Sequence, residues 1–201
     1  MSTVFFTSDI HLGHKKVSEL RGFKTTEEHD AHIVSVWNSR VTKHDTVYVL
    51  GDIAVGAHNY ALETIKTLNG RKHLISGNHD IVHPMHKRGH SRAEQMKWLD
   101  TFETITPFLR KTSDHRQYLL SHFPYEEWGD GEKREGSRYN QYRLPNVGIP
   151  LLHGHTHGQE RAHGNMLHVG WDAWGEPVNI KHIEAWLETL PSFSSFENHH
   201  D

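Results

Sequence analysis

Five short polar blocks along the chain carry side chains that bind metal ions well. They are Asp9-Ile10-His11, Gly51-Asp52, Gly77-Asn78-His79-Asp80, Ser121-His122 and Gly154-His155-Thr156-His157. Carboxylate, amide and imidazole groups suit borderline divalent ions such as Mn²⁺, Fe²⁺, Co²⁺, Ni²⁺ or Zn²⁺. Because the blocks hold more such groups than one ion needs, they indicate a centre that holds two ions.

The segments in front of the blocks predict an α/β fold that brings the blocks together. β-Branched and aromatic runs predict strands at 4–7, 46–50, 72–76, 117–122, 149–155 and 165–169. Helices are expected at 26–41, which follows a capping-box pattern, at 60–68, and over the final apolar stripe from about 180 to 190. Strands joined by helices place their carboxyl ends on one edge of a sheet, where ligands bind. We therefore expect groups that are distant in the sequence to share one site.

A long segment, 123–147, separates two of the predicted strands and is rich in Gly, Glu, Arg and Tyr. A connection of this length in a compact domain indicates a functional loop or lid. Within it, Arg138 and Tyr139 are candidates to contact substrate, through a phosphate or an aromatic stack. The alternative is that the aromatic side chains of the segment pack on the rest of the chain. His14, just behind the first block, is a third candidate for a substrate contact.

The chain has 21 histidines, and most of them are expected to lie outside the site. His153 is the least obvious of these because it stands next to the last block. Strand alternation points its side chain away from the site if His155 points inward. We expect His153 to have a structural role.

The order of the blocks, Asp-x-His, Gly-Asp, Gly-Asn-His-Asp, His and Gly-His-x-His, resembles that of the calcineurin-like metallophosphoesterases. All five blocks are present between Asp9 and His157. The start at 6–14 and the segment 169–175 further resemble a small bacterial and phage branch of that family. The resemblance implies an α/β fold with a two-layered β-sheet sandwich core flanked by helices, formed as a single domain by residues 1–201.

The resemblance also implies how the blocks would bind metal. Two divalent ions are expected, Mn²⁺ foremost, with Fe, Zn, Ni or Co as alternatives. The first ion would be bound by Asp9, His11 and His157, the second by Asn78, His122 and His155, with Asp52 bridging the two. A hydroxide that bridges both ions would attack phosphorus in line, without a covalent phosphoenzyme.

His79 and Asp80 are implied to be catalytic. His79 would protonate the leaving group or donate to a phosphoryl oxygen, because an imidazole can give up a proton near neutral pH. Asp80 would orient His79 and raise its basicity, since a carboxylate beside a histidine fixes its tautomer and stabilises the imidazolium.

Composition narrows the classes of function. The 201 residues include 22 Lys and Arg, 25 Asp and Glu, and no cysteine, for a net charge of −3. The absence of cysteine excludes disulfides, a thiolate nucleophile and cysteine-bound zinc. The even charge balance argues against long nucleic acid or an anionic membrane as a partner. With no apolar stretch near the ~20 residues that span a bilayer and no basic leader, we expect a cytoplasmic protein.

The leading functional hypothesis is a phosphodiesterase that acts on a small or cyclic nucleotide-type diester. No arginine stands beside the ligand blocks in the sequence to clamp the dianionic phosphate of a monoester. A phosphomonoesterase and a nuclease stay open as alternatives, as does a non-catalytic metal-binding interaction module. The sequence leaves the oligomeric state open.

Overall fold

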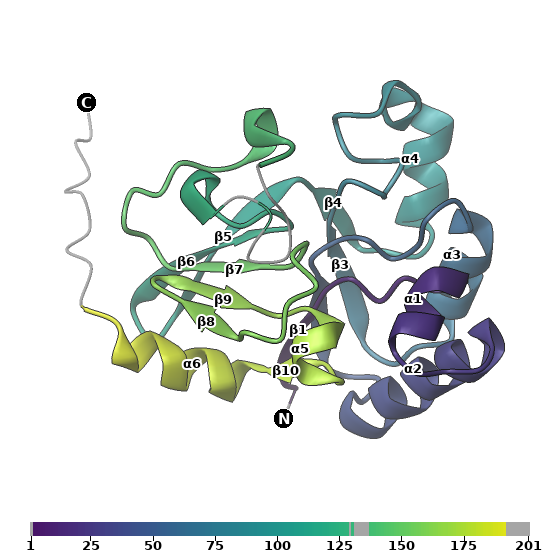
Figure 1. Ribbon diagram of the computed structural model, residues 1–201, viewed down its shortest axis with the longest axis horizontal. Helices are drawn as coiled ribbons and strands as arrows, with labels where there is room; N and C mark the ends of the chain where they lie inside the picture. The colour runs from purple at the N-terminus through teal and green to yellow at the C-terminus, as the bar shows by residue number, and fades with distance from the viewer. Residues whose placement is uncertain (1, 129, 131–136, 192–201) are drawn as a thin grey trace.

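Two five-stranded sheets form the centre of the molecule in the computed structural model, which describes residues 2–128, 130 and 137–191 (Figure 1). The first sheet has the order β10-β1-β2-β3-β4 and the second the order β5-β6-β7-β9-β8. The strands of the first sheet are β1 (Val4–Thr7), β2 (Thr46–Val49), β3 (Arg71–Ile75), β4 (Thr104–Thr106) and β10 (Val178–Asn179). Those of the second are β5 (Phe108–Ser113), β6 (Arg116–Ser121), β7 (Leu151–His153), β8 (Ala162–His163) and β9 (Met166–His168).

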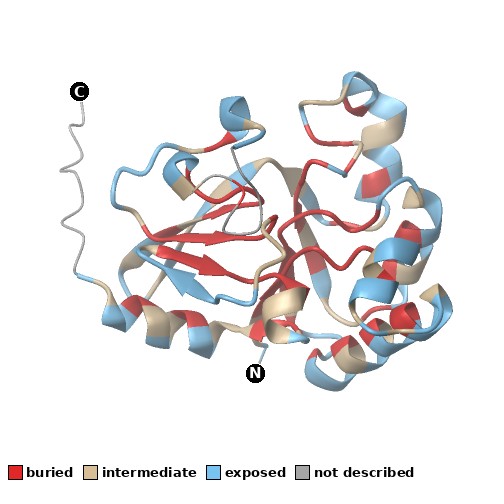
Figure 2. Cartoon of the chain, in the orientation of Figure 1, coloured by how far each residue is buried: buried red, intermediate tan, exposed pale blue. Residues whose placement is uncertain are grey.

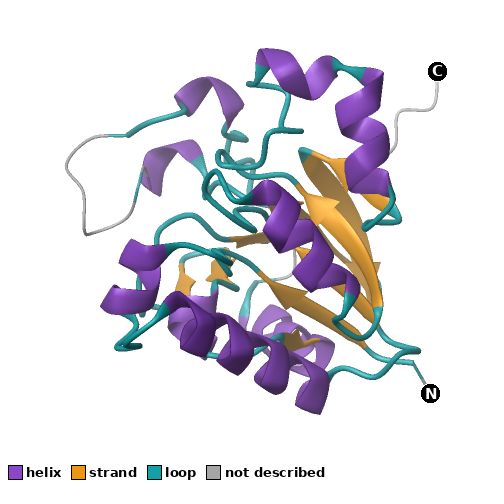
Figure 3. Ribbon diagram, turned by 90° about the vertical axis from the view of Figure 1, so that its right-hand side faces the viewer, coloured by secondary structure: helices purple, strands orange, loops and turns teal. Residues whose placement is uncertain are grey.

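Helices surround the two sheets (Figure 3). The α-helices are α1 (Lys15–Leu20), α2 (Thr26–Arg40), α3 (His58–Lys66), α4 (Arg92–Leu99), α5 (Trp171–Trp174) and α6 (Ile180–Thr189). Three short 3-10 helices are η1 (Lys87–His90), η2 (Glu126–Trp128) and η3 (Asn140–Tyr142). The predicted α/β fold with a two-layered sheet core flanked by helices is confirmed.

The alternation of side chains along the first sheet explains why it is covered on both faces. Phe5 and Val47 are register partners and pack in the core formed with α2, α3 and α4. Their neighbours Phe6 and Tyr48 are also register partners and lie between the two sheets. Successive strand residues point to opposite faces, so each strand contributes to both cores. Figure 2 shows the buried residues concentrated in the sheets and in the loops that follow the strands.

Local sequence signals place the long helices. The Thr25 hydroxyl accepts a hydrogen bond from the Glu28 backbone N–H at 3.1 Å and begins α2, as the capping-box pattern predicts. In the same helix Trp37 is fully buried, and its Nε1 donates to the Asn69 carbonyl at 3.0 Å. Helix α3 begins two residues before the predicted 60–68 range and ends at Lys66.

Several short elements are not predicted from the sequence. Helices α1 and α5 span six and four residues, too few to show a helical period. Strand β10 has two residues and exists because it pairs antiparallel with β1. These elements depend on contacts with distant parts of the chain, which a local sequence pattern does not encode.

The long segment between β6 and β7 packs partly on the outer face of the second sheet. Tyr125 is fully buried beside Leu151 and Met166, and its hydroxyl donates to the Ile149 carbonyl at 2.6 Å. For this residue the alternative of aromatic packing is the one observed. Within the described ranges, no helix combines the length and the apolar character required to cross a membrane.

Candidate metal centre

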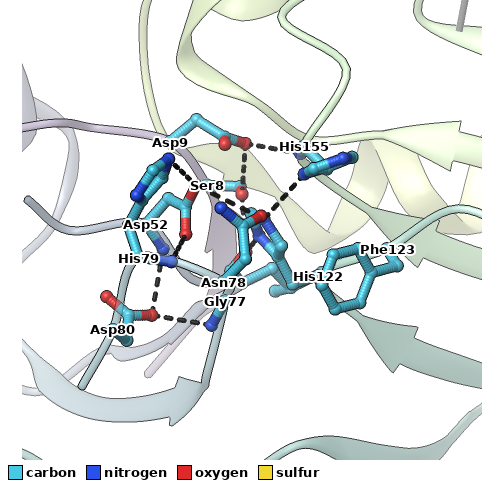
Figure 4. Close-up of polar contacts among 12 residues, drawn as sticks. Ser8, Asp9, Asp52, Gly77, Asn78, His79, Asp80, His122, Phe123 and His155 are labelled. Carbon is cyan, nitrogen blue, oxygen red and sulfur yellow. Dashed lines mark hydrogen bonds and ion pairs between the residues drawn. The ribbon is translucent and has the colours of Figure 1, made fainter. Parts of the chain in front are cut away.

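The five blocks converge where the strands of both sheets end, as Figure 4 shows for their central members. Asp9 follows β1 and Asp52 follows β2, and the two loops are joined by a hydrogen bond from the Asp9 N–H to the Gly51 carbonyl at 3.0 Å. The second sheet joins them through the His155 N–H, which donates to Asp9 Oδ2 at 2.9 Å. Sequence-distant groups therefore share one site, as expected.

The backbone at the ligand positions is strained. Eight non-glycine residues in the described chain have positive φ, and five of them are predicted metal ligands, namely Asp9, His11, Asp52, His155 and His157. A positive φ is unfavourable for residues with a side chain and collects at functional sites, where the surrounding structure enforces it. At these five positions the strained backbone conformation directs the side chain from its loop toward a common centre.

The first ligand group consists of Asp9, His11 and His157. The two histidine Nε2 atoms lie 3.1 Å apart, and they lie 3.9 Å (His11) and 3.7 Å (His157) from Asp9 Oδ1. Asp9 Oδ1 is buried and has no hydrogen-bond partner. The other carboxylate oxygen is held, because Oδ2 accepts from the His155 N–H at 2.9 Å and lies 2.5 Å from Ser8 Oγ.

The second ligand group adjoins the first and includes Asp9, Asp52 and His122. His122 Nε2 lies 3.5 Å from Asp52 Oδ2, 3.1 Å from Asn78 Oδ1 and 3.3 Å from His155 Nδ1. Asp52 Oδ2 is also 4.0 Å from His11 Nε2. One Asp52 oxygen therefore faces both groups, which is the position of a bridging ligand.

These residues fit divalent ions. Ligand atoms about 2.1 Å from an ion lie about 3–4 Å from one another, which is the range of the distances above. An unpartnered buried carboxylate oxygen is costly in a chain without a cation nearby, and Asp9 Oδ1 is such an atom. The donors are all nitrogen and oxygen, as the absence of cysteine requires.

Charge coupling inside the centre is strong. Burial lowers the pKa of His122, but the Asp52 and Asp9 carboxylates outweigh it and raise that pKa to about 9. Burial raises the pKa of Asp52, and the His122 charge outweighs it, so this carboxyl stays ionised. Burial lowers the pKa of His11 to about 3 and that of His155 to about 4, which keeps both imidazoles neutral and able to bind a cation.

Glycine is required where the loops approach most closely. A Cβ at Gly154 would lie 1.9 Å from Ser8 Oγ and 2.4 Å from Asp9 Oδ2. A Cβ at Gly77 would lie 2.4 Å from Asp52 Oδ1. Both contacts are far shorter than van der Waals distance, so a side chain at either position would displace a ligand carboxylate.

No family model matches the chain. Over 198 residues it is 40% identical to the gene 66 protein of Mycobacterium phage L5, an alignment that covers 91% of this chain and 93% of the phage protein. The gene 66 protein of Mycobacterium phage D29 is 40% identical over 202 residues, which cover 94% of this chain and 98% of that protein. The chain belongs to the mycobacteriophage gene 66 protein family.

This gene 66 family chain shares its fold with a more distant protein. A solved structure of a protein of unknown function from Aquifex aeolicus aligns with a TM-score of 0.67 and 22% sequence identity, covering 92% of this chain and 100% of that chain. Both proteins therefore have the same overall architecture.

His79 and Asp80, the two residues predicted to be catalytic, have different surroundings. The His79 side chain is 42% exposed, and its Nε2 lies 3.9 Å from Asp52 Oδ2. The expected orientation of His79 by Asp80 is wrong. The buried Asp80 carboxylate instead accepts backbone N–H groups of Gly77, Asp52 and Ile53 at 2.7, 3.0 and 3.1 Å, so it ties two strand-end loops together.

The three residues predicted to contact substrate differ in whether they line the cleft beside the site. His14 and Arg138 line a cleft with His11 and His157 of the first ligand group. The His14 ring is engaged as the cap of α1, where Nδ1 accepts from the Val17 N–H at 3.1 Å. The Tyr139 ring packs against Phe123, with ring centroids 5.4 Å apart. Tyr139 is not among the residues that line the cleft, but its ring also lies against that of His155, which does line it, with centroids 5.8 Å apart, so its substrate contact stays a prediction.

Sequence reasoning missed three charged residues that support the site. Asp172 Oδ2 lies 2.8 Å from His157 Nδ1, and Arg21 pairs with Asp172. Asp130 Oδ1 lies 3.2 Å from His155 Nε2. The only signal for Asp172 was its place in the 169–175 segment. The ring of His153 stacks on His168 with centroids 5.3 Å apart, in agreement with a structural role.

Proposed function

We propose that this gene 66 family chain is a metal-dependent phosphoester hydrolase of the calcineurin-like type, with a preference for small phosphodiesters such as cyclic nucleotide-type diesters. The observation that carries the proposal is the pair of adjoining ligand groups that share Asp9, with Asp52 between them. His11 and His157 of the first group line a cleft of about 530 Å³, together with the neighbouring His155. Two divalent ions bound there would supply Lewis acidity toward phosphoryl oxygens and would lower the pKa of an attacking water.

His79 is the residue best placed to handle the proton of the leaving group. It lines the cleft with His11, and its ring is more exposed than the buried ligands. Its backbone is held on both sides, since its N–H donates to Asp52 Oδ1 at 2.8 Å and its carbonyl lies 2.8 Å from His58 Nε2. Burial lowers the pKa of His79, and the Asp52 carboxylate acts in the opposite direction. A partly exposed imidazole held beside the centre can deliver a proton to a departing oxygen.

The surroundings of the centre favour a diester over a monoester. A monoester dianion is best held by a free guanidinium group. All five N–H bonds of Arg21 are directed to protein acceptors, and Arg143 is buried against Asp130 and Pro124. Arg138 reaches the cleft but bonds Asp130 through Nε.

Three apolar side chains that line the cleft, beside Lys16, suit the organic part of a second ester. Val17 and Leu20 of α1 and Val55 after β2 line the cleft together with the ligand residues. Leu20 is 74% exposed and Val55 is 37% exposed. Apolar surface at the mouth of a cleft is available to cover a ring or an alkyl group of substrate.

The test is hydrolysis of a panel of phosphomonoesters, linear diesters and cyclic diesters by the chain reconstituted with Mn²⁺, beside the Asp52→Asn variant. We expect diester hydrolysis that is lost in the variant and in excess chelator. A higher kcat/KM for monoesters would contradict the substrate preference. Two bound ions without hydrolysis of any ester would favour the non-catalytic metal-binding module instead.

A further inference from the structure

Arg21, at the end of α1, directs four of the five N–H groups of its guanidinium group to the first ligand loop and to Asp172, and the fifth to His29. Its side chain is 9% exposed. Nε and Nη2 donate to the two Asp172 oxygens at 3.0 and 2.9 Å. Nη2 also donates to the Asp9 carbonyl at 2.7 Å, and Nη1 donates to the Ile10 carbonyl and to His29 Nε2, both at 3.0 Å. Five donors in a rigid plane are thus matched by five acceptors.

The Arg21–Asp172 pair determines which nitrogen of His157 faces the centre. Both Asp172 oxygens accept hydrogen bonds from the Arg21 guanidinium group, through Nε and Nη2. A carboxylate paired in this way only accepts hydrogen bonds, so His157 Nδ1, 2.8 Å away, carries the proton that it donates to Asp172. The lone pair of Nε2 is then directed toward His11 and Asp9.

The same guanidinium group holds the backbone of the other two ligands in the first group. Asp9 and His11 have φ values of 56° and 49°. The Asp9 carbonyl and the carbonyl of Ile10, which lies between the two ligands in the chain, both accept hydrogen bonds from Arg21. Backbone in this region relaxes unless its surroundings hold it. Arg21 therefore acts on all three ligands of the first group, on two through their backbone and on His157 through Asp172.

Apart from Asp9, which the two groups share, the second ligand group is supported by different residues. His155 Nε2 contacts Asp130, and the His122 Nδ1–H donates to the Leu50 carbonyl at 2.7 Å. Loss of Arg21 should therefore affect the two ions unequally. This asymmetry separates a specific role from general destabilisation.

We propose that Arg21 is a positioning residue that, through Asp172 and the Asp9 and Ile10 carbonyls, sets the geometry and the His157 tautomer of the first metal site. The inference rests on the metal centre of the proposed function. It does not depend on hydrolysis or on the identity of the substrate.

Titration calorimetry of Mn²⁺ into the metal-free full chain tests the proposal. We expect two ions for the unchanged chain, and for Arg21→Met and Asp172→Asn an affinity for one ion that is about 10–100-fold weaker. The affinity for the other ion should stay within about threefold. Arg21→Lys keeps the positive charge but lacks the planar guanidinium group that binds both Asp172 oxygens. Its affinity for the affected ion should lie between those of Arg21→Met and the unchanged chain.

Arg40→Met is the matched control, because it removes an exposed arginine whose Nε lies 2.5 Å from Glu176 Oε2. It should bind both ions as the unchanged chain does. If Arg21→Met does not fold, as judged by circular dichroism, Asp172→Asn still decides, because it preserves the shape of the side chain.

Three results would overturn the proposal. One is wild-type affinity for both ions in Asp172→Asn and in any folded Arg21 variant. Another is an equal decrease in the affinity for both ions, which would indicate that Arg21 has only a structural role. The third, no binding of Mn²⁺ by the unchanged chain, would overturn the proposed function as well. Failure of hydrolysis with two ions bound would count against the proposed function and leave the role of Arg21 standing.

Discussion

His79 and His122 lie 43 positions apart, yet both face Asp52, with Nε2 atoms 3.9 and 3.5 Å from its Oδ2. Exposure distinguishes the roles that we propose for them. The fully buried His122 shares its environment with the ligands, whereas the partly exposed His79 faces the cleft. Two histidines beside one carboxylate can therefore differ in function, one as a ligand and one as an acid.

Replacement of His79 should have an effect that depends on the leaving group. For His79→Ala we expect kcat to fall about 10²–10⁴-fold with diesters of alkyl alcohols, which need a proton on the departing oxygen. The decrease should be much smaller with 4-nitrophenyl esters, whose leaving group departs as an anion. Steady-state kinetics on both substrates checks this, with His44→Ala, at an exposed position, as the control. An equal decrease for both substrates would exclude a general acid role.

Binding of metal should release a proton from His122. Its pKa of about 9 means that the imidazole is charged at pH 7–8 in the metal-free chain, and a charged imidazole cannot bind a cation. Affinity for the second ion should therefore rise about tenfold for each pH unit up to about pH 9 and level off above it. Calorimetry in buffers of different ionisation enthalpy measures the proton count, and no proton released at pH 7.5 would contradict the prediction.

The loops that follow the strands, rather than the strands themselves, carry the predicted ligands. They are tied to one another by backbone hydrogen bonds and by the Asp80 carboxylate, which accepts N–H groups from two of them. The loops approach so closely that glycine is the one residue that fits at certain positions. A set of interlocked loops of this kind is a rigid support for a metal centre.

The Gly154 position should not tolerate a methyl group. For Gly154→Ala we expect at least a tenfold weaker affinity for Mn²⁺ and a free energy of unfolding that is lower by about 1–3 kcal/mol, because the new Cβ would overlap Ser8 and the Asp9 carboxylate. Gly158→Ala, in the same loop, is the control, since its nearest contact would be an ordinary 3.8 Å. Calorimetry measures the Mn²⁺ affinity of the two variants, and urea unfolding measures their free energy of unfolding. Equal values for Gly154→Ala and Gly158→Ala would contradict the close contact at Gly154.

The candidate metal centre joins the two halves of the molecule. Asp9 and Asp52 come from loops of the first sheet, and His122, His155 and His157 come from loops of the second. Ions bound between them would therefore connect the two layers of the sandwich at one edge. The unfolded chain does not bring these groups together, so binding energy adds to the stability of the folded state.

Mn²⁺ should therefore raise the thermal stability of the whole chain. At free metal about 100 times the Kd of one site, stabilisation is about 2.7 kcal/mol, which corresponds to an increase in Tm of about 5–10 °C for a chain of this size. Differential scanning calorimetry with Mn²⁺ and with chelator measures it. Asp52→Asn should lose most of the increase, and an unchanged chain with the same Tm in both conditions would contradict the bridging arrangement.

The sequence by itself predicted six of the strands, the helices α2, α3 and α6, and the candidate ligands. Each of these is written locally, as an apolar run, a capping pattern at Thr25, or a carboxylate or imidazole placed directly after a strand. The prediction that Asp80 orients His79 was wrong, because neighbours in the chain need not have side chains in contact. The backbone turns between them, and Asp80 meets three amide groups instead.

Only the tertiary structure decided how the ligands are held. Arg21 and Asp172 are 151 positions apart, and His157 and Asp172 are 15 apart in segments with no common pattern. Their pairing exists because the end of α1 and the start of α5 meet beside the first strand of the sheet, where Trp171 N–H donates to the Ser8 carbonyl. Side-chain chemistry and apolar periodicity can be read along a chain. Hydrogen bonds between distant segments depend on how the layers pack, and no local pattern specifies that.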